Sequence, residues 1–161
     1  MMSTRTPSRA NCAGFTLLEL VIVIVISGIL SFMAIGRLND TGEVNAHGFA
    51  EQVASTLRFA QQAAVSQRRL IYINASASNG SVTACLDSAL ACAQPLSAPG
   101  GSNLAVQAPA SVTLTSTAAQ FSFDGLGRPS VASQIQIVVT AADGQRFNVT
   151  VEPDSGYVRR S

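Results

Sequence analysis

An almost uninterrupted apolar run from Phe15 to Ile35 constrains this chain more than any other feature. The run reads FTLLELVIVIVISGILSFMAI and carries a single charge, on Glu19. A helix of this length rises roughly 30 Å, the thickness of the hydrocarbon core of a bilayer. The alternative, a buried helix of a soluble protein, requires a domain large enough to cover the run on all sides. We therefore expect a transmembrane helix over residues 15–36.

The residues before the run indicate its orientation. They include Arg5 and Arg9 and no acidic residue, so the short end is expected in the cytoplasm and everything after about residue 37 is expected to be exported. A secretory signal has its small-residue cleavage site after the apolar run. Here Ala13 and Gly14 precede the run, and Cys12 has no apolar stretch before it, which also disfavours a lipoprotein signal.

Composition excludes several classes of function. The 161 residues suit one domain, and 12% of them are charged, against about 25% in an average globular protein. All ten basic residues are arginines, which excludes a P-loop and Schiff-base lysine chemistry. A single histidine, His47, excludes histidine-built metal sites and most catalytic triads. Without a nucleophile elbow or a convincing carboxylate pair, we expect neither an enzyme nor a cofactor or metal.

Helical periodicity follows the apolar run. Asp40, with Glu43 three residues later, is a candidate helix cap after a break in the pattern. Apolar residues then recur at steps of four, four, three and four, at Phe49, Val53, Leu57, Ala60 and Ala64. We expect a helix over about residues 43–69 whose stripe faces a core; the alternative is a groove for a partner.

Short alternating or β-branched runs predict strands from residue 70 onward. They lie at residues 70–75, 81–86, 111–115, 120–123, 135–141 and 146–151. The clearest pairing is a hairpin across Asp143-Gly144. Alternation then places Ile135, Ile137 and Val139 on one face, and Phe147, Val149 and Val151 on one face of the partner strand. The prediction is an α+β fold, in which a long N-terminal helix packs on an antiparallel β-sheet over about residues 70–158.

The segment GFTLLELVIVIVISGIL, residues 14–30, resembles the N-terminus of type IV prepilins. In that family a membrane peptidase cuts after the glycine, and the new terminal phenylalanine is N-methylated. The resemblance implies a leader over residues 1–14, cleavage after Gly14, methylation of Phe15 and a periplasmic pilin-like domain over residues 37–161. It also implies a single-pass protein of the bacterial inner membrane whose partners are the prepilin peptidase and other pilins or pseudopilins of one filament.

Glu19 is the residue that a plain membrane anchor does not need. A carboxylate in the apolar part of a membrane helix costs up to ~3 kcal/mol on insertion scales and is therefore a functional candidate. The prepilin resemblance implies that Glu19 pairs with the free amine of Phe15 on a neighbouring subunit during filament assembly. The alternative is an acid that the membrane interface tolerates.

A second resemblance lies in FSFDGLGRP, residues 121–129, which is similar to the F-x-F-x-x-x-G motif of the GspH/FimT family of minor pilins and pseudopilins. The end of the chain, VTVEPDSGYVRR, resembles the closing strand, turn and glycine of that family. Its Ser-Gly-Tyr-Val, residues 155–158, is most similar to MshC-like minor pilins of the mannose-sensitive haemagglutinin pilus. Gly125 and Gly127 are expected to be structural, because no third glycine completes a phosphate-binding pattern.

Removal of the leader would remove Cys12 and leave Cys85 and Cys92. An even count in an exported domain predicts a disulfide, here with six residues between the cysteines. Two free thiols are the alternative. The spacing does not fit a C-x-x-C redox or zinc site.

Two functions remain open at this point. The first is a structural subunit of a type IV pilus or of a type II secretion pseudopilus, assembled through its N-terminal helix. The second is a DNA-binding minor pilin, because some FimT-like members capture DNA through a C-terminal G-R-x-R pattern. Here Tyr157 follows Gly156, so the first arginine of that pattern is missing.

The charge of the exported part disfavours nucleic acid without excluding it. From Arg37 onward eight arginines balance eight acidic residues, whereas phosphate binding needs clustered positive charge. The candidate nucleic-acid-binding residues are Arg159 and Arg160, with Arg128 or Arg146. The sequence does not indicate which pilus, secretion or uptake machine contains the chain.

Overall fold

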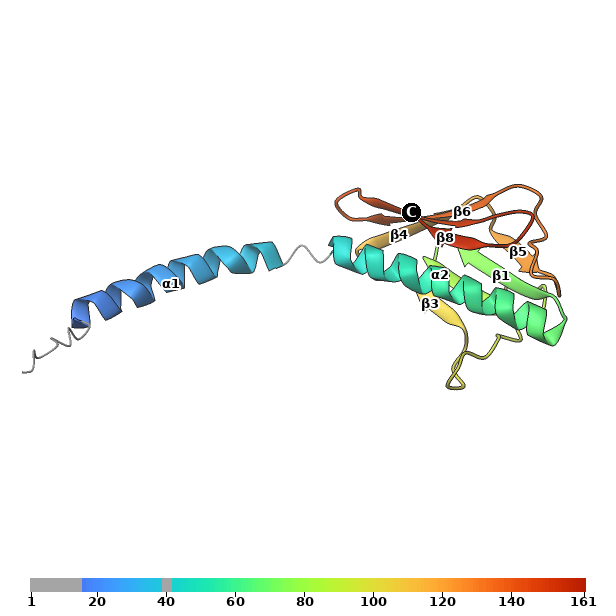
Figure 1. The fold of residues 1–161 in the computed structure, drawn as a ribbon, viewed down its shortest axis with the longest axis horizontal. Helices are drawn as coiled ribbons and strands as arrows, with labels where there is room; N and C mark the ends of the chain where they lie inside the picture. The colour runs from blue at the N-terminus through green and yellow to red at the C-terminus, as the bar shows by residue number, and fades with distance from the viewer. Residues whose placement is uncertain (1–15, 39–41) are drawn as a thin grey trace, which may run out of the picture. The chain divides into compact units, whose positions relative to one another are not determined.

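The computed structural model describes residues 16–38 and 42–161, which belong to two compact units (Figure 1). The first unit contains helix α1, Leu17–Leu38, and the second contains helix α2, Gly42–Gln67, followed by eight strands. Three residues with an expected role, Gly14, Phe15 and the candidate cap Asp40, lie outside the described residues.

Helix α1 begins with a cap that the sequence analysis did not identify. The backbone N–H of Glu19 donates to Thr16 Oγ1 at 3.2 Å, and that of Leu20 donates to the Thr16 carbonyl at 3.2 Å. Thr-x-x-Glu is the signature of a capping box, and an acid in the first turn suits the positive end of the helix dipole. The Thr16 hydroxyl therefore caps α1, and the Glu19 carboxylate adds a favourable charge at this end of the helix.

Among the residues that the structure describes, no helix combines the length and the hydropathy needed to cross a bilayer. The membrane span of residues 15–36 stays a prediction.

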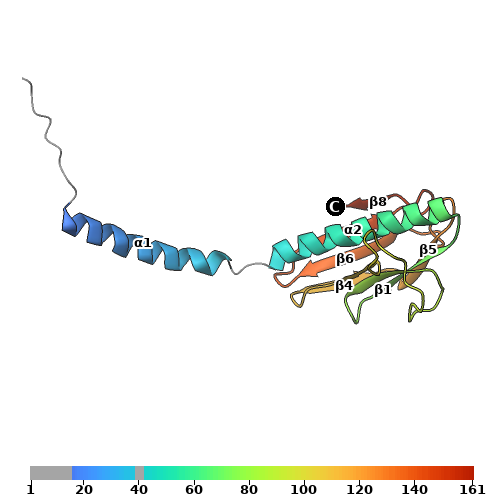
Figure 2. The same cartoon turned by 90° about the horizontal axis from the view of Figure 1, so that it is seen from below.

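Helix α2 packs through the predicted apolar stripe. Phe49, Val53, Leu57, Ala60 and Ala64 are all buried, which confirms that the stripe faces the core. The helix contacts strands throughout the second unit, and Figure 2 shows it lying over the strands. The stripe is therefore the seam along which the helix and the β-structure share one core.

The strands form two antiparallel sheets, where the sequence analysis expected one. The strands are β1 Ile71–Ser76, β2 Ser81–Cys85, β3 Ala105–Gln107, β4 Val112–Ser116, β5 Gln120–Phe123, β6 Ile135–Ala141, β7 Arg146–Val151 and β8 Val158–Arg160. The sheet orders are β3-β2-β1-β5 and β4-β6-β7-β8. Local alternation identifies a strand but not its partner, which is why the division into two sheets was not predicted. The α+β class, a helix packed on antiparallel β-structure, is confirmed.

The hairpin across Asp143-Gly144 has the predicted register. Val139 lies opposite Phe147, Ile137 opposite Val149 and Ile135 opposite Val151. The side chains at 135, 137, 139, 149 and 151 are fully buried. Strands β3 and β8 were not predicted, and each has only three residues, too few for a period-2 pattern to appear.

One side chain of α2 holds two distant turns. Gln61 Nε2 donates to the carbonyl of Gly127 at 2.9 Å and to that of Ser155 at 3.0 Å. The turns come so close that a Cβ on Gly156 would collide with the Gly127 carbonyl oxygen and lie 2.6 Å from Gln61 Nε2. Gly156 also has φ +67°, a left-handed conformation that disfavours other residues. Both the space and the backbone therefore require glycine.

We predict that Gly156→Ala lowers the free energy of unfolding by about 3 kcal/mol, from backbone strain plus overpacking. Gly144→Ala is the matched control, because Gly144 also has a left-handed φ, +89°, but a Cβ added there would meet no atom within 4 Å. The control should lose about 1 kcal/mol from strain alone. Urea denaturation of the full chain in detergent, followed by circular dichroism, measures both. Equal losses would contradict the close approach of the two turns.

Candidate functional site

The first candidate site is the apolar surface of α1 around Glu19. From Leu17 to Ser31 the side chains of α1 are exposed within its own unit, and almost all of them are apolar. A contiguous apolar surface of this extent marks a site for a membrane or a protein partner. Glu19 adds the one carboxylate of this surface. The arrangement can pack against other apolar helices and offer them a single negative charge.

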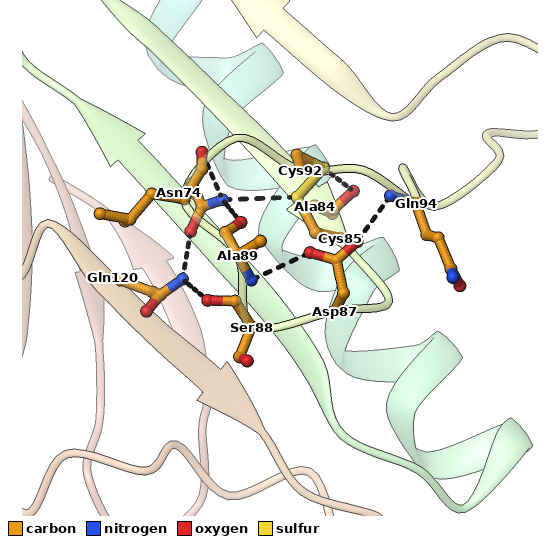
Figure 3. The surroundings of a disulfide bond; sticks show 10 residues. Asn74, Ala84, Cys85, Asp87, Ser88, Ala89, Cys92, Gln94 and Gln120 are labelled. Atoms are coloured by element: carbon orange, nitrogen blue, oxygen red, sulfur yellow. Dashed lines mark hydrogen bonds between the residues drawn. A yellow bond between two sulfur atoms is a disulfide. The ribbon is translucent and has the colours of Figure 1, made fainter.

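The second site is the disulfide loop. The structure joins Cys85, at the end of β2, to Cys92, with their Cα atoms 5.5 Å apart (Figure 3). The carboxylate of Asp87 accepts the N–H of Ala89 within the loop at 3.0 Å and that of Gln94, just after the loop, at 2.6 Å. The disulfide and the Asp87 carboxylate thus both stabilise this short segment.

Amide side chains of β1 and β5 bind the loop through hydrogen bonds. Asn74 of β1 donates through Nδ2 to the carbonyls of Ala89 and Leu90, at 3.2 and 3.3 Å. Gln120 of β5 donates to Asn74 Oδ1 at 2.8 Å and to the Ser88 carbonyl at 3.0 Å. Figure 3 shows these amides between the strands and the loop. This contact makes the loop a fixed part of the surface, and no local sequence pattern indicates the role of either amide.

The candidate nucleic-acid-binding arginines do not form one free basic patch. Arg160 Nε lies 3.0 Å from Glu51 Oε2, Arg159 Nε lies 3.4 Å from Glu152 Oε1, and Arg128 Nε lies 3.9 Å from Asp124 Oδ2. Arg146 begins β7 beside the hairpin turn, at the other end of that strand from Glu152. Three of the four positive charges are therefore offset by carboxylates of the same domain.

Glu51 links the C-terminal strand to α2. Its second oxygen accepts a hydrogen bond from Arg58 Nη1 at 3.3 Å, and Arg58 Nε donates to the Val158 carbonyl at 3.4 Å. These groups are partly exposed, so each ion pair contributes at most about 1 kcal/mol. Their effect is to fix β8 along α2 and to engage the arginines at the end of the chain.

The turn after β5 explains the second family-like motif. Phe121 and Phe123 are buried in the core, and the turn that follows places Gly125 against the end of α2, where a Cβ would lie 3.2 Å from Arg68 Cα. Gly127 has φ +82°. Both glycines have the structural role that the sequence indicates.

Asp124 holds this turn, a role that the sequence analysis did not predict. Its Oδ1 accepts the N–H of Arg128 at 2.8 Å and that of Leu126 at 2.9 Å. The hydrogen bond from the Arg128 backbone, with smaller contributions from the Leu126 N–H and the Arg128 guanidinium, lowers the pKa of Asp124 below its ordinary value of 3.8. An Asx turn of this kind stabilises its own loop and needs no ligand.

Two family models match the chain. Residues 9–35 match the prokaryotic N-terminal methylation motif. Residues 50–155, more than half of the chain, match the model described as type II transport protein GspH. No curated protein sequence matches significantly.

Solved structures share the fold. The type IV minor pilin FimU of Pseudomonas aeruginosa aligns with a TM-score of 0.61 and 18% identity, over 75% of this chain and 91% of that one. A second crystal form of FimU aligns with a TM-score of 0.58 and 17% identity, over 71% of this chain and 91% of that one. The minor pseudopilin EpsH from the type 2 secretion system of Vibrio cholerae aligns with a TM-score of 0.55 and 12% identity, over 74% of this chain and 95% of that one. At such identities the likeness establishes the fold alone.

We predict that replacing both Cys85 and Cys92 by alanine lowers the free energy of unfolding by about 2–3 kcal/mol, because the unfolded chain is no longer closed by the short loop. Urea denaturation measures the loss. Mass spectrometry of the alkylated, unreduced protein provides the control, since neither cysteine should be labelled. Labelling of both would contradict the disulfide.

The pKa of Asp124 also predicts a pH dependence. Because it is lower in the folded state than in the unfolded state, the carboxylate stabilises the fold above pH 3.8, and this contribution is lost as the pH falls through the folded-state pKa. As the pH is lowered from about 5 to 2, the urea concentration at the midpoint of unfolding should therefore fall less steeply in Asp124→Asn than in the wild type. Asp143→Asn is the matched control, since Asp143 accepts only the Gln145 N–H in its turn. The same pH profile in wild type and Asp124→Asn would contradict this role.

Proposed function

The chain belongs to the GspH family of type II transport proteins, and from this premise we propose that it is cut after Gly14, N-methylated at Phe15 and assembled through its N-terminal helix. Membership makes it a minor pilin or pseudopilin of a type IV pilus or type II secretion system. The observation that carries the proposal is one carboxylate, Glu19, in the first turn of a largely apolar helix that overlaps a matched methylation motif.

The proposed mechanism assigns two tasks to the stem. Before assembly, the apolar run of residues 15–35 anchors the chain in the inner membrane, with the domain in the periplasm. During assembly, the exposed apolar side chains of α1 pack against the stems of neighbouring subunits. Because a carboxylate is costly in such surroundings, Glu19 favours the register in which it meets the amine of a neighbour's processed Phe15.

Processing supplies the partner charge of Glu19. Cleavage after Gly14 creates a primary amine on Phe15, and N-methylation leaves that amine basic and positively charged. An uncut chain carries the leader at this position and has no amine there. We propose that the prepilin peptidase, the inner membrane and the other subunits of the filament are therefore the partners of this chain.

Among the minor pilins, we propose that this chain is MshC-like and belongs to a mannose-sensitive haemagglutinin pilus. This assignment rests on the Ser-Gly-Tyr-Val of residues 155–158. In the fold this segment runs from the turn before β8 to the first residue of that strand, and Gly156 packs against Gly127 and Gln61. A structural requirement thus explains the glycine, and the exposed Tyr157 is the large side chain of this segment that is available for recognition.

DNA capture is not favoured by the described arginines. Arg159 and Arg160 are engaged by Glu152 and Glu51, and phosphate binding would have to displace both carboxylates. We propose no catalytic role, and the described side chains include no group of three or more metal-ligating residues.

We predict that Glu19→Gln reduces incorporation of the chain into sheared filaments at least tenfold, because the amide keeps the shape and polarity of the side chain but lacks the charge. Glu19→Ala, which removes both properties, should be at least as impaired. Glu43→Ala is the matched control, since Glu43 is an exposed acid in the first turn of α2.

Immunoblots of the filament and membrane fractions compare assembly with insertion. All variants should reach the membrane equally. Normal incorporation of Glu19→Gln would show that the charge is dispensable and would reject the pairing with Phe15.

A further inference from the structure

Arg68 has a backbone conformation that usually belongs to glycine. It follows the last residue of α2 and has φ 50°. The N–H of Arg69 donates to the Ala64 carbonyl at 3.2 Å, and the N–H of Arg68 donates to that of Val65 at 3.4 Å. This is the helix end in which the left-handed position is normally glycine. The chain keeps an arginine here against a backbone penalty, and such strained residues cluster at functional sites.

The charge of Arg68 is also available. Arg58, Arg128, Arg159 and Arg160 each lie within 4 Å of a carboxylate oxygen. The exposed Arg68 side chain has neither an ion pair nor a hydrogen bond within the ranges 16–38 and 42–161, apart from residues whose side chains are not described. The strain therefore does not serve a contact inside the domain.

Two exposed apolar side chains lie on the segments that meet at this position. The turn after β5 packs on the end of α2, since a Cβ on Gly125 would lie 3.2 Å from Arg68 Cα and one on Gly127 would lie 3.1 Å from Val65 Cγ2. Between these glycines, Leu126 is 70% exposed, and Val65 is 46% exposed. Both views show the end of α2 beside β5 (Figures 1 and 2). We call Val65, Arg68 and Leu126 the Arg68 corner.

We propose that the Arg68 corner docks a segment of a neighbouring pilin subunit that presents a carboxylate between apolar side chains. This inference rests on the proposed function. A guanidinium can bind a carboxylate through two parallel hydrogen bonds, and the apolar side chains exclude water from the pair once the segment is bound. Arginine among apolar residues is the composition that protein interfaces favour.

A protein segment suits the corner better than a nucleic acid does. Phosphate binding draws on several free cations, whereas Arg159 and Arg160 are paired with Glu152 and Glu51. Arg69, next to Arg68, donates to the Leu86 carbonyl at 3.3 Å. Leu126 and Val65 offer nothing to a phosphate backbone.

The first experiment separates strain from function at Arg68 in the full chain. Arg68→Gly should raise the melting temperature by about 3 °C, because glycine relieves the backbone, yet reduce incorporation into filaments at least fivefold. Arg68→Glu should reduce it further, through repulsion of the partner carboxylate. Arg146→Glu is the matched control, a charge reversal at an exposed arginine that begins β7, and should assemble normally.

A lower melting temperature in Arg68→Gly would mean that the side chain serves the fold, and normal assembly of Arg68→Glu would mean that the charge binds no partner. Either result overturns the proposal. If Glu19→Gln fails to assemble while Arg68→Glu assembles normally, the proposed function stands and the docking corner alone is rejected.

The second experiment identifies the partner. A benzoylphenylalanine placed at Leu126 in the full chain is photoactivated in cells, and mass spectrometry sequences the cross-linked peptide. We expect a peptide from another pilin of the same filament that contains Asp or Glu, and at least a tenfold loss of this product with Arg68→Glu. A peptide without an acidic residue, a cross-link to DNA, or a product that Arg68→Glu leaves unchanged would overturn the proposal.

Discussion

The burial of one face of α2 is the interaction on which the rest of the domain depends. Phe49, Val53 and Leu57 are each at most 2% exposed, and full burial of side chains of this size contributes about 1.5–3 kcal/mol each. Because α2 contacts strands of both sheets, the same stripe sets the position of each sheet. The polar contacts at the edges of the helix can form only after this packing is in place.

Those polar contacts determine which parts of the surface remain free. Glu51 binds arginines of α2 and β8 at once, so the C-terminal arginines belong to the structure of the domain. Gln61 fixes the turns at Gly127 and Ser155 against the helix. Just after α2 ends at Gln67, the backbone is strained at Arg68. The Arg68 side chain has no ion pair or hydrogen bond in the described part of the chain. A domain that pairs four of its described arginines with carboxylates and leaves the strained Arg68 without such a partner suits a subunit that recognises its neighbours.

The sequence predicted those features that repeat locally. The spacing of the apolar residues located the buried face of α2, and the alternation on either side of Asp143-Gly144 predicted the register of β6 and β7. The count of cysteines after processing predicted the pair that the structure joins. The six strand runs were identified, whereas β3 and β8 were too short to show a period. The Thr16 cap could have been predicted from Thr-x-x-Glu, a local signal that was not used.

Features that join distant residues could not be predicted in this way. Gln61 and Ser155, or Glu51 and Arg160, meet only because α2 and the C-terminal strand pack together, and no local pattern encodes that meeting. Nor does the sequence indicate that Arg68 lies in a left-handed conformation, since arginine is common within helices. The candidate binding arginines, chosen from a C-terminal sequence pattern, therefore included residues that pair with carboxylates of the same domain.

The central claim is that the stem becomes an assembly element when its leader is removed. The most direct measurement is the mass of the N-terminal peptide of the chain isolated from membranes of cells with an active prepilin peptidase. The account predicts a peptide that begins with N-methylated Phe15. A chain that still carries residues 1–14 would contradict it, because Glu19 would then have no processed amine to meet.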